Sequence, residues 1–284
     1  MAELLKGKAV ADALTEQSVS RVEALAGKGI TPTLAIVRLG ENPSDLSYEK
    51  GAMKRAEKTG VAVKQFVFDE GISQEELIAA IEGINADDSI HGVLMFRPLP
   101  KHIDEKLVCE KLDPAKDMDG ITSGSMAGVF MDAEVGYPPC TAEAVMEILD
   151  HYGVELKGKK VTIFGRSLVI GKPVAMMTMR KHATITVCHS RTAQEDFAAA
   201  GRNADIVIAA LGRARMVGPE KLGSNQIIID VGINVDEEGK LCGDVDFDRV
   251  EPDAAAITPV PGGVGSVTTA VLMKHVIRAA ELKA

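Results

Sequence analysis

Short apolar runs that alternate with helical patterns constrain this chain more than any other feature. The runs are rich in Val and Ile, as expected for strands that lie inside a sheet. They fall at 33–37, 61–68 and 92–96 in the first half, and at 160–164, 184–188, 206–210 and 227–231 in the second. Strands that alternate with helices form parallel sheets covered by helices. The sequence therefore predicts an α/β fold with two successive β-α series.

The segments between these runs carry helical patterns. Ser73 and Glu76 form a capping box, and Gly60 follows the segment before it as a helix-ending residue. Thr141 is placed to cap the helix that follows it. Residues 113–140, rich in Gly, Asp and Pro, are predicted to be irregular and either functional or a linker. The predicted helices span 1–30, 45–59, 74–85, 141–152, 171–182 and 267–282.

Composition excludes several classes of protein. The formal net charge is −9, so a phosphate backbone would be repelled and nucleic acid is not an expected partner. No run of about 18 apolar residues is present, and no membrane association is expected. The N-terminus lacks the pattern of a signal peptide, and the four cysteines are far apart. These features favour the cytoplasm and indicate no metal site.

A glycine-rich loop follows the predicted strand at 160–164. Gly165 would allow a tight turn, and Gly171 would let the backbone approach a pyrophosphate at the start of the next helix. Pro173 suits the first helical turn. Ser167 stands where the usual GxGxxG motif has its middle glycine, so an ordinary strand-to-helix turn is the alternative. The loop predicts a dinucleotide-binding domain.

The end of the next predicted strand indicates which dinucleotide. NAD enzymes usually place a carboxylate there for the ribose 2′-hydroxyl, but this chain has His189-Ser190-Arg191-Thr192. A hydroxyl and guanidinium groups, including that of Arg166, suit a 2′-phosphate. NADP is therefore favoured over NAD, although Arg191 could equally be a solvated surface charge. Gly232, at the exit of a later strand, is expected either to lie near the cofactor or to form a plain turn.

The segment 258–268, Thr-Pro-Val-Pro-Gly-Gly-Val-Gly-Ser-Val-Thr, is too unusual for a generic loop. It resembles the signature of the methylenetetrahydrofolate dehydrogenase/cyclohydrolase family, the FolD type. Other segments resemble that family in the same order along nearly the whole chain. These are 98–100, 113–120, 139–141, 165–173, 189–192, 230–234 and 243–245.

The resemblance implies two domains. Residues 1–140 with the C-terminal helix 267–284 would form an α/β folate-binding catalytic domain, and residues 141–266 a Rossmann-type NADP domain, with the active cleft between them. It further implies a homodimer that oxidises 5,10-methylenetetrahydrofolate, with the hydride passing to NADP. The ring of Tyr48 would pack on the folate, and Asp119 would accept hydrogen bonds from the pterin, unless its carboxylate is only a turn cap.

The same resemblance implies the remaining site residues. Leu99, Pro261, Gly262 and Gly263 would line the substrate site with Tyr48 and Asp119. A second set of residues would bind the cofactor. Arg191 is included because it lies at the end of the strand where the 2′-phosphate is expected. The cofactor-binding residues are Gly165, Arg166, Ser167, Ser190, Arg191 and Ile233.

Two positions depart from the family pattern. The family shows Tyr-x-x-x-Lys, and its lysine is tied to hydrolysis of the methenyl product, but Ala52 stands at that position here. Lys54 is two residues further, about 200° around a regular helix, and would reach the site only if Gly51 distorts the helix. The family's Gln-Leu-Pro-Leu-Pro reads Phe-Arg-Pro-Leu-Pro, with Arg97 at or beside the glutamine. Arginine is a poor general base. Dehydrogenase activity with weak or absent cyclohydrolase activity is predicted.

Three other functions stay open on the sequence. One is a bifunctional dehydrogenase/cyclohydrolase in which Arg97 or Lys54 sustains both reactions. Another is a catalytically silent NADP-binding relative, which the intact Gly165 loop and Gly262-Gly263 segment argue against. The last is a dehydrogenase of small hydroxy or amino acids, which needs a proton-relay His or Lys. None of the six histidines falls in a recognisable catalytic motif.

Overall fold

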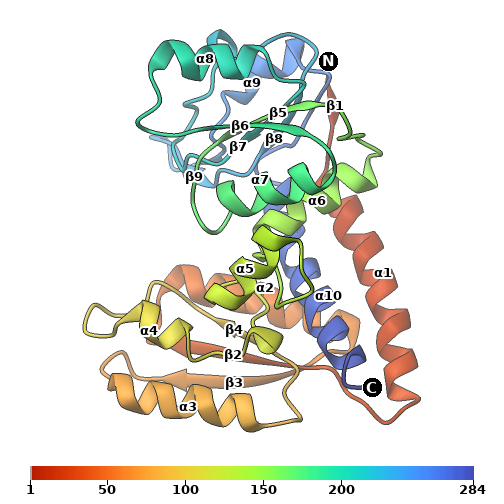
Figure 1. Cartoon of the computed structure of the whole chain (residues 1–284), viewed down its shortest axis with the longest axis vertical. Helices are drawn as coiled ribbons and strands as arrows, with labels where there is room; N and C mark the ends of the chain where they lie inside the picture. The colour runs from red at the N-terminus through yellow and green to blue at the C-terminus, as the bar shows by residue number, and fades with distance from the viewer. Residues whose placement is uncertain (1) are drawn as a thin grey trace. The chain divides into compact units, whose positions relative to one another are not determined.

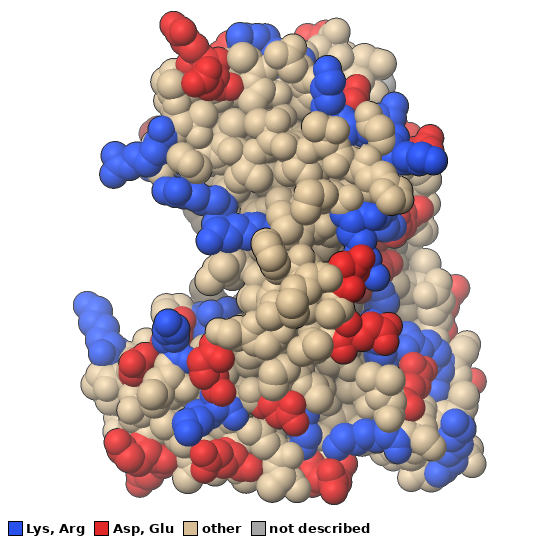
Figure 2. Space-filling model, in the orientation of Figure 1, with Lys and Arg blue, Asp and Glu red and all other residues tan. Residues whose placement is uncertain are grey.

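The computed structural model describes residues 2–284 and divides into two compact units. We call them the six-stranded unit and the three-stranded unit after their main sheets. The six-stranded unit contains the described residues up to 11 together with 141–268, and the three-stranded unit contains 12–140 and 269–284. On the face drawn in Figure 2, acidic and basic side chains are interspersed over each unit. The predicted α/β fold class is confirmed.

The three-stranded unit is built on the parallel strands β2 (Thr33–Leu39), β3 (Ala62–Phe68) and β4 (Gly92–Met95), in the order β3-β2-β4. All seven residues of the central β2 are buried. One side of α3 (Gln74–Ala86) packs its buried Leu77, Ile81 and Ile84 against β2 and β4. Figure 1 shows α3 on one face of this sheet and α2 (Pro43–Thr59) on the other. Within this unit the chain also forms α4 (Glu105–Cys109) and α5 (Ser123–Met131).

The local signals for α2 and α3 are confirmed. Ser73 accepts a hydrogen bond from the N–H of Glu76, whose side chain in turn accepts from the N–H of Ser73. Gly60 ends α2 with a φ of 77°, and its N–H donates to the carbonyl of Ala56. This left-handed conformation favours glycine, which is why the helix ends there.

The prediction that residues 113–140 are irregular is wrong in part, because α5 lies within them. Thr122 caps α5 by accepting from the N–H of Ser125. Gly124 and Gly128 lower the intrinsic helix propensity and hide the helix from sequence reasoning. A β-carbon at Gly128 would lie 2.1 Å from the carbonyl oxygen of Val135, so close packing requires the glycine. The predicted cap at Thr141 is also wrong, since α6 (Cys140–His151) already begins at Cys140.

The six-stranded unit has an all-parallel sheet in the order β1-β11-β8-β7-β5-β6. Helices α6, α7 and α8 accompany it, as Figure 1 shows, and the short antiparallel pair β9 and β10 and helix α9 follow β8 along the chain. The bounds are β1 Glu3–Leu4, β5 Lys160–Phe164, β6 Thr184–Cys188, β7 Ile206–Ala209, β8 Ile227–Asp230, β9 Asn234–Val235, β10 Leu241–Cys242, β11 Ala256–Ile257, α7 Gly171–Arg180, α8 Gln194–Arg202 and α9 Phe247–Val250.

The start of the chain differs from its prediction. Residues 1–30 were expected to form one helix of the first domain, but β1 pairs with β11 and only then does α1 (Gly7–Ala26) begin. Glu3 lies opposite Ala256, and the N–H of Leu5 donates to the carbonyl of Ile257. A strand of two residues is too short to produce a periodic signal, so its place in the sheet depends on tertiary pairing.

A buried ion pair joins α2 to its sheet. The guanidinium of Arg38, on β2, donates to the carboxylate of Glu49, on α2, at 2.7 Å, and both side chains are buried. Arg38 also donates to the carbonyl of Gly40, and the amide of Gln65 donates to Glu49 at 2.5 Å. These extra hydrogen bonds offset part of the desolvation cost of the two charges. The pair fixes α2, and therefore Tyr48 beside Glu49, against the sheet.

Removing one partner of this pair is expected to be costly. The substitution Arg38→Met leaves the Glu49 carboxylate buried without its cation and should lower the free energy of unfolding by about 3 to 5 kcal/mol. Chemical denaturation followed by circular dichroism measures the change. Lys64→Met, which breaks the exposed Lys64–Asp87 pair, is the control and should cost less than about 1 kcal/mol. Equal losses in the two variants would contradict the assignment.

Candidate active site

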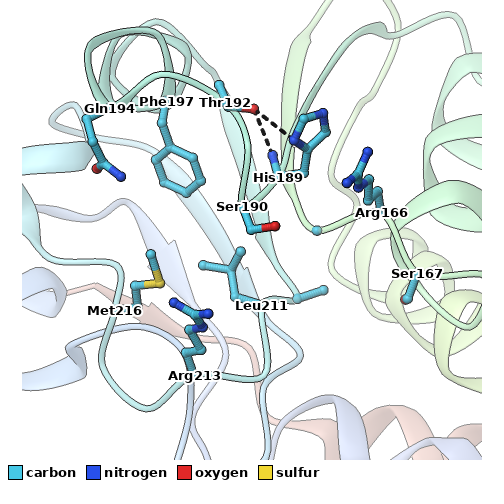
Figure 3. Close-up of a pocket in the computed structure, with 12 residues that line it drawn as sticks. Arg166, Ser167, His189, Ser190, Thr192, Gln194, Phe197, Leu211, Arg213 and Met216 are labelled. Atoms are coloured by element: carbon cyan, nitrogen blue, oxygen red, sulfur yellow. Dashed lines mark hydrogen bonds between the residues drawn. The ribbon is translucent and has the colours of Figure 1, made fainter.

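A pocket of about 410 Å³ lies in the six-stranded unit at the carboxyl ends of β5, β6 and β7. Ligands of open α/β sheets bind at this edge, because the loops that leave adjacent parallel strands meet there. We call it the strand-end pocket, and Figure 3 shows its side chains. It is lined by Gly165, Arg166, Ser167, His189, Ser190, Thr192, Gln194, Phe197, Ala210, Leu211, Arg213 and Met216.

The glycine-rich loop forms one wall of the strand-end pocket. Gly165 has a φ of 133°, and a β-carbon on it would lie 2.2 Å from the carbonyl oxygen of Ala210. A β-carbon on Gly171 would lie 2.3 Å from the carbonyl oxygen of Gly165. The hydroxyl of Ser167 accepts from the N–H of Ile170 at 3.1 Å and folds the loop onto the start of α7. A side chain at either position would collide with the backbone of the loops, so the tight turn between β5 and α7 requires both glycines.

The loop after β6 forms a second wall. His189 and Thr192 are joined by a hydrogen bond from the His189 N–H to the Thr192 hydroxyl at 2.9 Å (Figure 3). Ser190 lies exposed between them and lines the pocket. The predicted Arg191 is also exposed, but it is not among the lining residues, and its N–H donates to the ring of His189 at 3.1 Å. The structure brings Arg166 and Ser190 to the pocket and leaves Arg191 off its lining.

The loop after β7 forms the third wall, and sequence reasoning missed it. It adds Leu211, Arg213 and Met216 to the pocket. The signal was present, because this loop leaves a buried strand at the same sheet edge as the glycine-rich loop. Without a known motif in the loop, the individual side chains could not be selected. Arg213 is the second arginine of the pocket.

Two buried carboxylates hold these loops in place. Asp244, fully buried, accepts from the N–H groups of Leu211, Gly212 and Arg213, the last at 2.8 Å, and from the side-chain amide of Asn234 at 2.9 Å. Asp230, at the end of β8, accepts from the N–H groups of Gly232, Asp244 and Val245 at 2.9–3.0 Å. The two aspartates therefore tie the ends of β7 and β8 together.

Glycines make room for this carboxylate pair. A β-carbon on Gly243 would lie 1.8 Å from a carboxylate oxygen of Asp230, and one on Gly232 would lie 2.4 Å from the carboxyl carbon of Asp244. Burial raises the pKa of Asp230 to about 7, and the neighbouring Asp244 adds to the rise, while the N–H groups of Val245, Asp244 and Gly232 oppose it. The segments 230–234 and 243–245 thus serve first to organise the loops.

A second pocket of the six-stranded unit has a volume of about 260 Å³ and is lined mostly by apolar residues and glycines. It brings together Ile233, Pro261, Gly262 and Gly263, which the sequence assigned to the cofactor and to the substrate. Gly262 has a φ of 103°, and its carbonyl accepts from the N–H of Gly7 at 2.8 Å. The structure thus places one predicted cofactor residue beside three predicted substrate residues.

In the three-stranded unit, an aromatic pair lies where α2 meets the end of β4. The rings of Tyr48 and Phe96 meet edge to face, with centroids 5.9 Å apart. Arg97, half-buried, pairs with Glu105 at 3.6 Å, and Glu105 also accepts from the N–H of Leu99 at 2.8 Å. Aligned on the shared Pro-Leu-Pro, the family's glutamine falls on Phe96 and its leucine on Arg97. Of the two positions considered for Arg97, at the glutamine or beside it, this alignment favours the second.

The loop before α5 holds the predicted Asp119. Asp117, buried, accepts from the N–H groups of Ile121 and Thr122 at 3.0 and 2.8 Å. Asp119 is half-buried, and its carboxylate accepts from the N–H of Cys140 at 2.8 Å. Burial raises the pKa of Asp119, and the hydrogen bonds from Cys140 oppose the rise. One carboxylate oxygen is thus engaged within the protein.

Lys116 anchors the same loop to α3. Its ammonium group donates to the carbonyls of Ile84, Asn85 and Asp87 at 2.8–2.9 Å, at the C-terminal end of that helix. The carbonyls of Ile84 and Asp87 also accept from the N–H groups of Asp87 and Ile90, and the lysine adds a charged donor at this end of the helix. Charged residues of the family-like segment 113–120 therefore serve to anchor this loop.

The lysine expected on α2 is absent, and the helix does not compensate for it. Helix α2 runs without interruption through Gly51, so Ala52 and Lys54 lie about 200° apart around its axis. Ala52 is fully buried, whereas Lys54 is exposed. Lys54 therefore lies off the face that carries Ala52, and the local distortion that would bring it there is not observed.

Together, the parallel six-stranded sheet and the glycine-rich strand-end pocket define a dinucleotide-binding α/β protein. Comparison with known proteins identifies the family. Residues 5–119 match the tetrahydrofolate dehydrogenase/cyclohydrolase catalytic domain, and residues 139–284 match the NAD(P)-binding domain of the same family. The chain belongs to the tetrahydrofolate dehydrogenase/cyclohydrolase family. The predicted family and its dinucleotide domain are confirmed.

Relatives resemble the whole chain. The bifunctional protein FolD of Carboxydothermus hydrogenoformans is 51% identical, covering 99% of this chain and 98% of the relative. That of Clostridioides difficile is 47% identical, covering 99% and 97%. The bifunctional FolD structure from Campylobacter jejuni has a TM-score of 0.96 at 37% identity and covers 100% of both chains. The Trypanosoma brucei FolD structure, complexed with NADP cofactor and inhibitor, has a TM-score of 0.93 at 34% identity and covers 99% and 98%.

No group of three or more His, Cys, Asp or Glu side chains within residues 2–284 is arranged to hold a metal ion. Over the same residues, no helix has the length and apolar character needed to cross a membrane.

The pKa of Asp230 makes stability depend on pH. Because folding raises the pKa from 3.8 to about 7, the folded state binds this proton more tightly than the unfolded state. The stabilisation of the folded state by the protonated Asp230 is complete below pH 4 and is lost as the pH rises through 7. The unfolding free energy of the wild type relative to Asp230→Asn should therefore fall between pH 4 and 7. Denaturant titrations at several pH values measure this difference in unfolding free energy. The same substitution at the exposed Asp248, Asp248→Asn, is the control. A difference that rises over this range would refute the assignment.

Proposed function

We propose that this protein is an NADP-dependent 5,10-methylenetetrahydrofolate dehydrogenase. The observation that carries the proposal is the match of both family domain models, which together cover residues 5–119 and 139–284. The relatives at 51% and 47% identity carry the FolD name over nearly the whole chain. The reaction removes a hydride from the C11 methylene bridge and leaves the 5,10-methenyl cation.

The strand-end pocket fits NADP. Arg166 and Ser190 line it and would lie beside the adenosine ribose, and none of its described lining residues is a carboxylate that would select the 2′-hydroxyl of NAD. Gly165 and Gly171 allow the tight turn that brings the loop to the start of α7, where the pyrophosphate would lie. NADP, when bound, supplies the hydride acceptor.

The substrate would be held by the three-stranded unit. The ring of Tyr48, kept in place by Phe96 and by the Arg38–Glu49 pair beside it, offers a flat surface for the pterin. Asp119 would accept hydrogen bonds from the amino-pyrimidine edge of the pterin, while the N–H of Cys140 holds its carboxylate in place. Leu99, buried next to Arg97, would contribute apolar contact. Pro261, Gly262 and Gly263 would bring backbone to the reacting end of the folate.

The protein residues have little bond chemistry to perform in this reaction. Two nitrogens share the charge of the methenyl product, so the residues mainly align the donor carbon with the nicotinamide. Such alignment can supply several kcal/mol, up to ~10 in good cases. A proton-relay side chain is not needed, and this agrees with the lack of a catalytic histidine motif. We further propose that the protein acts in the cytoplasm as a homodimer.

The proposal predicts a two-cofactor result. Purified protein with 5,10-methylenetetrahydrofolate should form the methenyl product with NADP, and its kcat/KM should be at least about 10-fold lower with NAD, because the pocket offers cations to the 2′-phosphate. Product absorbance measures both rates. A protein without turnover with either cofactor would fit the silent relative, and turnover only of small hydroxy acids would fit the third alternative.

The second reaction is a separate question. The names of the relatives include "bifunctional", which supports an enzyme with both activities. The residues of this chain support a slower hydrolysis: Ala52 is buried where the family has its lysine, Lys54 is exposed elsewhere on α2, and Phe96 takes the glutamine's position. We propose that the dehydrogenase operates with a much reduced cyclohydrolase, because Ala52 carries no acid–base group and Lys54 lies off its face of α2.

Restoring the family residues tests this directly. Ala52→Lys combined with Phe96→Gln should raise enzyme-dependent hydrolysis of the methenyl compound at least about 10-fold, since a positioned acid–base group contributes 10²–10⁴-fold. Hydrolysis is followed as the loss of methenyl absorbance, corrected for the buffer rate. Met53→Lys adds the same charge at an exposed neighbouring position and should give no gain. Wild-type hydrolysis as fast as the dehydrogenase would establish the bifunctional alternative instead.

A further inference from the structure

The strand-end pocket contains a second arginine to which the sequence analysis assigned no role. Arg213 lies on the loop after β7, whereas Arg166 lies on the glycine-rich loop after β5. Figure 3 shows the two guanidinium groups on opposite sides of the pocket, with Ser190 between them. A ligand that fills the pocket would therefore meet a cation from each side.

The position of Arg213 is determined by its backbone. Its N–H donates to the buried Asp244 at 2.8 Å, and the preceding Gly212 donates to the same carboxylate at 3.1 Å. These backbone groups and the side-chain amide of Asn234 compensate the charge of Asp244 by hydrogen bonding. Asp244 itself does not line the pocket. The side chain of Arg213 is exposed and lines the pocket, while its backbone is held by Asp244.

The pocket lining is cationic. Two arginines contribute to it, and no carboxylate is found among its described lining residues. A guanidinium group binds phosphate oxygens through two parallel hydrogen bonds, and two guanidinium groups suit a phosphate of charge near −2. An adenine nucleotide that carries an additional phosphate on its ribose meets this requirement better than one that carries a hydroxyl there.

We propose that Arg213 is a specificity-determining residue that binds the 2′-phosphate of NADP opposite Arg166, and that Asp244 positions it. This inference rests on the proposed function for the identity of the dinucleotide. It differs from the sequence-based assignment, in which Arg191 supplies the additional cation. The Arg191 side chain is exposed and does not line the pocket.

The test compares equilibrium binding of two ligands that differ only in the 2′-phosphate. Calorimetric titration with 2′,5′-ADP and with 5′-AMP is carried out on the wild type, Arg213→Gln and Arg213→Lys. Arg213→Gln should weaken binding of 2′,5′-ADP about 10- to 100-fold and of 5′-AMP less than about 3-fold, as for a lost charge-assisted hydrogen bond. Arg213→Lys keeps the charge but not the paired geometry and should fall between the wild type and Arg213→Gln.

The chain provides a matched control on the same loop. Arg215 pairs with Asp236 at 2.9 Å and does not line the strand-end pocket, so Arg215→Gln should leave both affinities within about 3-fold of the wild type. Equal weakening of both ligands by Arg213→Gln, or no weakening, would overturn the proposal. Circular dichroism and the Tm of each variant verify folding. Binding requires no folate, so a protein without dehydrogenase turnover could still pass this test, and an active dehydrogenase could fail it.

Discussion

The strand-end pocket depends on a carboxylate that does not line it. Asp244 lies under the loop after β7 and accepts hydrogen bonds from three consecutive backbone N–H groups, while its own N–H donates to Asp230 at the end of β8. Two neighbouring strands are thereby joined beyond the last pair of their ladder. The buried negative charge is compensated by peptide dipoles, so no cation is needed, and both arginines of the pocket stay available to a ligand.

Charged side chains serve the same structural purpose in the three-stranded unit. Lys116 satisfies the carbonyls at the end of α3, and Asp117 satisfies the N–H groups at the start of α5. Directly after these two anchors the chain presents Asp119, whose carboxylate accepts from the N–H of Cys140. In a family motif, a charged residue can thus be essential to the geometry of a site without contacting its ligand.

Elements that depend on local interactions could be predicted from the sequence, whereas elements that depend on distant residues could not. The buried strands and α2 and α3 were predicted because periodicity, the Ser73 capping box and the Gly60 turn are local signals. Strand β1 and helix α5 were missed because each depends on distant partners: β1 on β11, and α5 on close packing at Gly128. In the site, Arg166 and Ser190 followed from their strands, whereas Arg213 requires knowledge of which loops share a sheet edge.

The departures from the family pattern affect the requirements of hydride transfer and of hydrolysis differently. Hydride transfer needs alignment of two bound molecules, and the residues that would provide it, from Tyr48 and Asp119 to the glycine-rich loop, are all present. Hydrolysis additionally needs a group that exchanges a proton with water, and the lysine that the family resemblance assigns to this step is replaced by Ala52. The space is occupied by a buried alanine, and the edge-to-face pair of Phe96 with Tyr48 keeps the aromatic wall intact. A substitution that removes a proton-exchanging group while preserving the packing surface can therefore alter one activity and spare the other.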